Sequence, residues 1–255
     1  MKNKSVSTKK DKKAKKRKLK LGGLIVILLL LYIIGSIIYY IFVLPVKNIY
    51  ITGLDLVSEK EVLDVINYKE GTPIVKVHSN SLIKKIEKLD LIESAKIKKS
   101  IFGNLTIDIK ENTILYYDTL SSKFVLSDGN KISSKEYIGY PTLNNYVPSK
   151  IEKKLINGLK KIDKDIIIMI SEIEYSPDSY NDTVVDDERF ILRMNDGNTV
   201  YVNMVNIKKI NKYQEIYASI SGGGTLYLDS NSKNYIFKTY AEEEMPEGEE
   251  LQDES

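Results

Sequence analysis

A run of twenty-four residues without a charged side chain, from Leu21 to Leu44, constrains this chain more than any other feature. Seventeen of these residues are Leu, Ile, Val or Phe. As a helix that rises about 1.5 Å per residue, the run would be about 36 Å long, which is enough to cross the hydrocarbon core of a bilayer with some tilt. We therefore predict a transmembrane helix over residues 21–44.

A cleaved secretory signal peptide is the alternative interpretation of this run. The apolar region of a signal peptide is about 7–15 residues long and is followed by small residues at the cleavage site. Here the run ends in the bulky segment 39–44, YYIFVL, which offers a peptidase no small residue. The pattern favours a retained anchor, with Tyr39 and Tyr40 at the outer membrane interface.

Charge is concentrated at the two ends of the chain, although the whole carries a net charge of only +3. Residues 1–20 hold eleven Lys or Arg and one acid, whereas residues 241–255 hold eight acids and no base. Because basic residues stay on the cytoplasmic side of a membrane helix, we predict a cytoplasmic N-terminus and export of everything after Pro45. Both ends are expected to be disordered tails.

The basic tail is expected to contact anionic lipid at the inner leaflet. A nucleic-acid-binding arm is the competing interpretation of such a tail. Residues 1–20 contain no aromatic side chain for stacking on bases, so we expect no nucleic acid as a partner.

The composition argues against most catalytic sites. The absence of Cys excludes disulfides, thiolate metal sites and cysteine nucleophiles, and His78 is the one histidine. We expect His78 to be a surface or boundary residue, because a metal ligand needs partners. The acidic cluster Asp186–Glu188 is the only group that suggests acid–base chemistry, and it lies in a predicted loop over 176–188. We predict no catalytic residue, no cofactor site and no metal site.

The first exported region, predicted as a domain over residues 46–115, has the order strand, helix, helix, strand, strand. A β-branched and aromatic run over 46–52 predicts the first strand. Ser58-Glu59-Lys60-Glu61 is a capping box that predicts the start of a helix. Apolar residues recur at helical spacing in the second helix and at every second position in the last strand: Leu82, Ile86 and Leu89, and Leu105, Ile107 and Ile109. These patterns predict a small sheet with two helices on one face.

The second exported region, residues 116–240, is predicted to be mostly β with helices. Segments 124–132 and 190–202 each have a strand–turn–strand pattern, and 166–175 is strand-like. A second capping box, Ser149-Lys150-Ile151-Glu152, predicts a helix, and 207–220 predicts another. We interpret Gly222–Gly224 as the C-cap of that last helix rather than as a phosphate cradle.

These elements, in this order, resemble the FtsQ/DivIB family of bacterial cell-division proteins. Segments 46–53, 57–62, 71–74, 95–100 and 105–111 are similar to successive landmarks of a POTRA domain, placed directly after a single membrane helix. The resemblance covers residues 20–240. It implies an α+β fold: a transmembrane helix, a POTRA domain (β-α-α-β-β) and a second, mostly β domain with helices.

The resemblance also implies a function. The chain would be a non-enzymatic, single-pass scaffold of the divisome, in the bacterial cell membrane at the division septum. Its expected partners are FtsL-like and FtsB/DivIC-like bitopic proteins, and it would help regulate the septal peptidoglycan synthesis machinery. Two alternatives stay open: a membrane-anchored exported enzyme that uses the acidic cluster, and a POTRA-type export or assembly factor.

Aromatic residues near the end of the second domain are the candidate partner-binding residues. Packing of an edge strand would explain their clustering beside the acidic tail. Alternatively, a partner chain adds a strand there through backbone hydrogen bonds, with the aromatic side chains supplying specificity. The family resemblance also implies that septal partners bind at the exposed end of this domain. The predicted partner-binding residues are Tyr227, Tyr235, Ile236, Phe237 and Tyr240.

Overall fold

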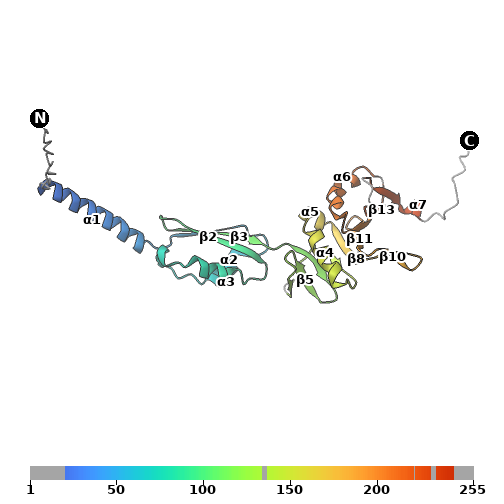
Figure 1. Cartoon of the computed structure of the whole chain (residues 1–255), viewed down its shortest axis with the longest axis horizontal. Coiled ribbons are helices and arrows are strands. Elements are labelled where there is room, and N and C mark those ends of the chain that lie inside the picture. The colour runs from blue at the N-terminus through green and yellow to red at the C-terminus, as the bar shows by residue number, and fades with distance from the viewer. Residues whose placement is uncertain (1–20, 134–136, 221, 231–233, 244–255) are drawn as a thin grey trace, which may run out of the picture.

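The computed structural model describes residues 21–133, 137–220, 222–230 and 234–243. The predicted basic tail lies outside the described residues, as does the acidic tail beyond residue 243. Figure 1 shows an elongated molecule, in which a long helix, a small domain and a larger domain follow one another along its length.

The long helix α1 spans Leu21–Val43, and none of its residues is buried. The most apolar stretch of this 23-residue helix has a mean hydropathy of 2.8. The helix is long and apolar enough to cross a membrane. The helix ends one residue before the predicted limit, because Leu44 is already buried in the small domain.

The small domain has a three-stranded sheet in the order β1-β3-β2. Strand β1 (Asn48–Thr52) runs parallel to β3 (Asn104–Glu111), and β2 (Ile92–Lys99) runs antiparallel to β3. Helices α2 (Glu59–Ile66) and α3 (Ser79–Ile86) lie along this sheet, with the short 3-10 helix η1 (Ile74–Lys76) between them in sequence. The predicted order of strands and helices is confirmed.

The capping box of α2 is present as predicted. The Glu61 backbone N–H donates to Ser58 Oγ at 3.2 Å, and the Ser58 N–H donates to Glu61 Oε2 at the same distance. Val62 follows in the next turn and is fully buried against Leu105 and Ile107 of β3 in one apolar core. The cap thus fixes where α2 starts and which face it turns to the sheet.

The larger domain is built on a nine-stranded sheet in the order β14-β13-β12-β11-β8-β7-β4-β5-β6. Its strands are β4 (Ile114–Asp118), β5 (Lys123–Leu126), β6 (Lys131–Ile132), β7 (Thr142–Leu143), β8 (Ile170–Tyr175), β11 (Arg189–Met194), β12 (Thr199–Asn203), β13 (Gly224–Tyr227) and β14 (Ile236–Thr239). The pairs β4–β7, β7–β8 and β12–β13 are parallel, and the others are antiparallel. Strands β14 and β6 are its two edges.

Helical segments supply the rest of the core of this domain. They are α4 (Ser149–Leu159), α5 (Lys164–Ile167), the 3-10 helix η2 (Ile207–Lys212), α6 (Tyr213–Tyr217) and α7 (Tyr240–Glu243). Leu155 and Leu159 of α4 are fully buried with Phe190 and Leu192 of β11 and with Tyr213 at the start of α6. The buried faces of α4, η2 and α6 therefore pack in the core with the sheet, whereas Tyr217 at the end of α6 is exposed.

Several local predictions in the larger domain are wrong. The box at Ser149 does not cap α4: the N-cap residue is Pro148, and no side chain bonds the first amides. Gly222–Gly224 is not a C-cap, because α6 ends at Tyr217 with Ala218 as its C-cap and Gly224 already belongs to β13. The first part of the strand-like segment 166–175 is helical, in α5.

The predicted loop over 176–188 is instead a hairpin. Strands β9 (Asp178–Tyr180) and β10 (Thr183–Asp186) pair with each other in a separate two-stranded sheet. Asn181 and Asp182 join them with positive φ, a conformation that Asn and Asp adopt more easily than most residues.

Candidate functional site

The free edge formed by Tyr235–Tyr240, which we call the β14 edge, brings the predicted partner-binding residues together. Ile236 and Phe237 lie in β14, Tyr235 precedes it and Tyr240 begins α7. Tyr227 lies opposite Ile236 on the neighbouring strand β13. β14 has β13 on one side and no strand of the described residues on the other.

The backbone of β14 presents hydrogen-bonding groups to this open side. In an antiparallel pair, successive residues point their amides alternately toward and away from the neighbouring strand. The Tyr240 N–H donates to the Gly223 carbonyl at 3.2 Å, so the amides of Lys238 and Ile236 also face β13. The peptide groups of Phe237 and Thr239 therefore face the open edge.

One of these outward amides already has a partner within the chain. The Thr239 N–H donates to Glu242 Oε2 at 2.7 Å, and the Thr239 hydroxyl donates to the same oxygen at 2.9 Å. These bonds hold the pKa of the Glu242 carboxyl below its ordinary value. Phe237 is thus the position at which β14 offers a free peptide group to an added strand.

The side chains of the β14 edge have different environments. Tyr235, Ile236 and Tyr240 are exposed, whereas Phe237 packs partly buried against the core. The Tyr240 hydroxyl donates to the Gly197 carbonyl at 2.8 Å, which ties the end of β14 to the β11–β12 turn. Tyr235 and Ile236 are therefore the side chains best placed to contact a partner.

A row of side chains on the outer face of the sheet leads to this edge. The register aligns Ile191, Tyr201, Tyr227 and Ile236 across four successive strands. The rings of Tyr201 and Tyr227 stack with centroids 5.1 Å apart and planes at 8°, and the Arg189 guanidinium lies 5.2 Å from the Tyr201 centroid. Sequence reasoning missed Tyr201 and Arg189, because only the strand register places them beside Tyr227.

In the acidic cluster Asp186–Glu188, the Asp186 and Glu188 carboxylates bind different partners and do not converge on one point. Asp186 accepts hydrogen bonds from Asn203 Nδ2 at 2.9 Å and from the Glu188 N–H at 2.8 Å. Glu188 forms an ion pair with Lys154 of α4. The described residues contain no group of three His, Cys, Asp or Glu side chains that could hold a metal ion. His78 precedes α3 and makes no capping hydrogen bond through its side chain.

Comparison with known proteins decides the family. A model described as "POTRA domain, FtsQ-type" matches residues 44–112, and one described as "Cell division protein FtsQ/DivIB, C-terminal" matches residues 115–236. Cell division protein DivIB of Bacillus subtilis is 30% identical over 210 residues, which cover 78% of this chain and 74% of that protein. The chain belongs to the FtsQ/DivIB family.

Other FtsQ/DivIB proteins also match this chain. Cell division protein DivIB of Listeria monocytogenes is 26% identical over 241 residues, covering 90% of this chain and 86% of that protein. The solved major extracytoplasmic domain of DivIB from Geobacillus stearothermophilus aligns with 20% identity and a TM-score of 0.35, over 44% of this chain and 95% of that one. The predicted family and the predicted α+β class are confirmed.

Membership of the FtsQ/DivIB family makes the chain a cell-division protein. The family is one of non-enzymatic division scaffolds, so the prediction that the chain is not an enzyme is also confirmed. The POTRA match is of the FtsQ type, which favours division over the export-factor alternative.

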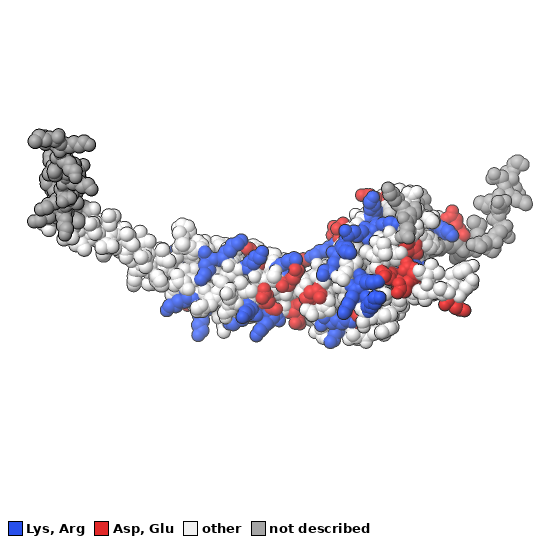
Figure 2. Space-filling view, in the orientation of Figure 1, with Lys and Arg blue, Asp and Glu red and all other residues white. Residues whose placement is uncertain are grey.

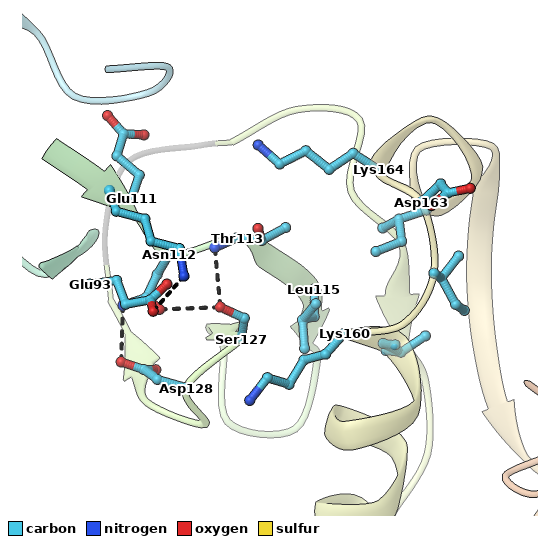
Figure 3. Close-up of a pocket in the computed structure, with 14 residues that line it drawn as sticks. Glu93, Glu111, Asn112, Thr113, Leu115, Ser127, Asp128, Lys160, Asp163 and Lys164 are labelled. Carbon is cyan, nitrogen blue, oxygen red and sulfur yellow. Dashed lines mark hydrogen bonds and ion pairs between the residues drawn. The ribbon is translucent and has the colours of Figure 1, made fainter. Parts of the chain in front are cut away.

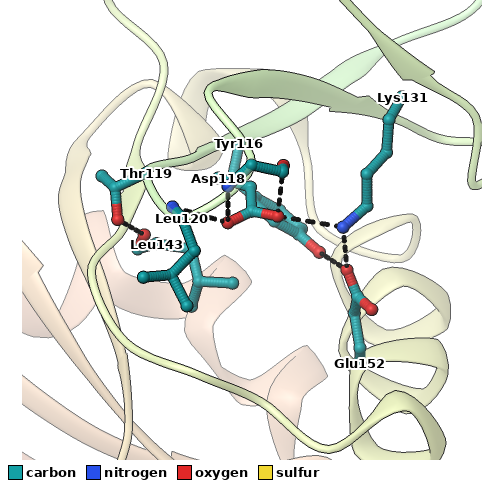
Figure 4. Close-up of polar contacts among 8 residues, drawn as sticks. Tyr116, Asp118, Thr119, Leu120, Lys131, Leu143 and Glu152 are labelled. Atoms are coloured by element: carbon teal, nitrogen blue, oxygen red, sulfur yellow. Dashed lines mark hydrogen bonds and ion pairs between the residues drawn. The ribbon is translucent and has the colours of Figure 1, made fainter.

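A half-buried ion network lies near the opposite edge of the sheet (Figure 4). Lys131 Nζ lies 2.9 Å from Asp118 Oδ2 and 2.8 Å from Glu152 Oε1, and the Tyr116 hydroxyl donates to the same Glu152 oxygen at 3.3 Å. Burial, reinforced by the nearby Glu152 carboxylate, raises the pKa of Tyr116 and keeps the phenol neutral. The network joins β4, β6 and α4, and this use of Glu152 explains why it does not cap α4.

The junction between the two domains of this FtsQ/DivIB chain contains a cleft of about 460 Å³. The buried Asn112 side chain donates to Asp128 Oδ2 at 3.0 Å and accepts from the Ser127 hydroxyl at 3.1 Å, as Figure 3 shows. Across the junction, Lys164 lies 3.2 Å from Asp55. The hydrogen bonds of Asn112 and the Lys164–Asp55 ion pair hold the junction together beside this cleft.

Proposed function

We propose that this FtsQ/DivIB protein is a single-pass membrane scaffold of the divisome, with residues 21–44 as its anchor. The basic tail, residues 1–20, stays in the cytoplasm against anionic lipid, and the POTRA domain (46–115) and β domain (116–240) are exported. The apolar, unburied surface of α1 supports the anchor, and the contrast between the flanking charges supports the orientation.

The β domain holds partner proteins at the β14 edge. The observation that carries this proposal is that β14 is an edge strand whose peptide groups at Phe237 face outward, with Tyr235 and Ile236 exposed beside them. An unpaired edge of this kind is a template for an added strand, for which backbone hydrogen bonds supply affinity and flanking side chains supply specificity. A segment of the partner pairs with β14 and contacts Tyr227, Tyr235, Ile236, Phe237 and Tyr240.

The partners are FtsL-like and FtsB/DivIC-like bitopic division proteins at the septum. By holding them at the outer face of the membrane, the scaffold helps regulate septal peptidoglycan synthesis. The supporting facts are the match of residues 115–236 to the FtsQ/DivIB C-terminal model and the division function of the relatives.

Affinity purification of the tagged full-length chain from membranes tests the edge. The variant combines Tyr235→Glu with Ile236→Asp, two exposed positions that can accept a charge without disturbing the core. Val205→Asp is the matched control, because Val205 is 77% exposed in the same domain but lies between β12 and η2, outside β14. We expect the double variant to lose FtsL-like and DivIC-like proteins from the eluate and the control to retain them.

Retention of these proteins by a folded double variant would refute the β14 edge as their binding site. A fluorescent fusion tests localisation separately. It should collect at midcell when the division machinery assembles, and an even distribution around the cell periphery at that stage would contradict the septal assignment.

A further inference from the structure

The membrane helix is joined to the POTRA domain without a flexible linker. α1 ends at Val43, and both Leu44 and Val46 are buried in the domain core. The Ile74 N–H donates to the Leu44 carbonyl at 2.9 Å, and the Val46 N–H donates to the Thr72 carbonyl at 3.0 Å. The position of the POTRA domain relative to the end of α1 is therefore fixed by backbone hydrogen bonds.

The turn between β2 and β3 carries two exposed apolar side chains. The turn is closed by the Gly103 N–H, which donates to the Ser100 carbonyl at 3.1 Å, and by the Ser100 N–H, which donates to the Asn104 carbonyl at 2.8 Å. Its central residues, Ile101 and Phe102, are 65% and 71% exposed. Tight turns usually place Gly, Pro, Asn, Asp or Ser at such positions, so this pair has no explanation in turn geometry.

This turn lies beside the point where the chain leaves α1. The Lys47 N–H donates to the Gly103 carbonyl at 2.7 Å. A Cβ atom at Gly103 would lie 2.6 Å from the Pro45 carbonyl oxygen, so the two segments touch. Figure 1 shows the β2–β3 turn at the end of the domain that adjoins α1. Ile101 and Phe102 are therefore held next to the membrane exit of the helix.

Other groups around the turn also suit a lipid interface. Val75 of η1 is exposed, and η1 packs against α1. Lys47 and Lys76 belong to the same end of the domain. On the face shown in Figure 2, basic side chains gather over the part of the POTRA domain nearest α1, and acidic ones lie toward the β domain. Apolar side chains flanked by Lys are the pattern of surfaces that bind anionic membranes.

We propose that Ile101 and Phe102 insert into the lipid interface of the outer leaflet, as a second membrane contact of the POTRA domain beside α1. This inference rests on the proposed anchoring by α1. Two contacts on one rigid body restrict rotation and tilt of the domain, so the joined β domain is presented at a set angle to the membrane. The occupant of this surface is the bilayer, and a protein partner is the alternative that the experiment separates.

Site-specific fluorescence on the full chain tests the insertion. The native sequence has no Cys, so each variant carries a single labelling site for an environment-sensitive fluorophore. Phe102→Cys is compared with Val205→Cys, an exposed site far from the membrane, and with Ile34→Cys within α1. The labelled proteins are reconstituted alone into phosphatidylglycerol–phosphatidylethanolamine vesicles that contain nitroxide-labelled lipid.

We expect a nitroxide near the headgroup to quench the label at residue 102 several-fold more than the label at residue 205. A label on Lys76→Cys should also be quenched, and this quenching should fall when Ile101 and Phe102 are both changed to Ser. If the label at 102 behaves like that at 205 while the label at 34 is quenched by a deep nitroxide, the insertion is wrong and the anchor stands. If the label at 34 is not quenched either, the anchoring itself is wrong.

Discussion

Replacing Lys131 with Met tests how the β domain is held together at the edge opposite β14. The change keeps most of the aliphatic side chain but removes the ammonium group that lies between the Asp118 and Glu152 carboxylates. The side chains of Lys131, Asp118 and Glu152 are only 32%, 10% and 21% exposed, so water replaces the lost cation poorly. The variant leaves two carboxylates facing a half-buried gap.

The expected loss follows from these contacts. A hydrogen bond to a charged group contributes about 1.5–3 kcal/mol, and partial exposure reduces the combined effect of two such bonds. We expect Lys131→Met to lower the free energy of unfolding by about 2–3 kcal/mol. The control is Lys98→Met, because Lys98 Nζ also lies 2.9 Å from a carboxylate oxygen, of Asp108, but the two side chains are 74% and 36% exposed. That control should lose much less, because water screens an exposed ion pair.

The pH dependence gives a second readout of the same contact. Burial alone would raise the pKa of Asp118, but hydrogen bonds from Ser121 and Lys131 outweigh it and hold the pKa below its ordinary value. A carboxyl with a lowered folded pKa stabilises the protein above its unfolded pKa, and this stabilisation is lost as pH falls through the folded value. Without Lys131, the pKa of Asp118 rises, and protonation relieves the repulsion from Glu152. The deficit of Lys131→Met should therefore shrink as the pH falls from about 7 to about 4.5.

The assay is urea unfolding of the detergent-solubilised full chain, followed by circular dichroism at several pH values. A Lys131→Met deficit equal to that of Lys98→Met would refute the structural role of the network. A large deficit that does not change with pH would show that the lost interaction is not with the two carboxylates.

The remaining predictions concern the two sheets. Ser58→Ala should destabilise the POTRA domain by about 1 kcal/mol, because the Glu61 N–H loses its hydrogen bond to Ser58 Oγ at the α2 cap, and unfolding unchanged within error would contradict this. Gly224→Ala should displace β14, because the added Cβ would lie 2.1 Å from the Lys238 carbonyl oxygen. Co-purification of the division partners should then fall while circular dichroism stays near wild type. Full partner recovery with Gly224→Ala would contradict the need for β14 in its observed place.

The features that were predicted correctly from the sequence are those decided by residues close together in the sequence. The Ser58 capping box and the alternating burial of β3 were predictable, because each is decided within a few residues. Sequence reasoning failed at α4, where the Glu152 carboxylate goes to Lys131 on a distant strand instead of to the helix N-terminus. Strand β4 was not predicted either, because its first three residues are all buried and show no alternation.

The residues of the candidate site were predictable from the sequence, but the exposure of their side chains was not. The five predicted partner-binding residues gather around β14, but their different exposure follows from how β14 packs. Phe237 is partly buried, whereas Tyr235 and Ile236 are exposed. Tyr201 lies beside Tyr227 because β12 pairs in parallel with β13, and no local pattern indicates this pairing. Arg189 reaches the Tyr201 ring from the neighbouring strand β11.

Amide hydrogen exchange of the full chain, with and without a DivIC-like partner, tests the central proposal most directly. The Phe237 amide faces the open edge of β14, so it should exchange rapidly in the free protein and become protected when a partner strand is added. The Lys238 amide faces β13 and should be protected in both states. Binding that leaves the Phe237 amide unprotected, with new protection elsewhere in the β domain, would contradict recruitment through this edge.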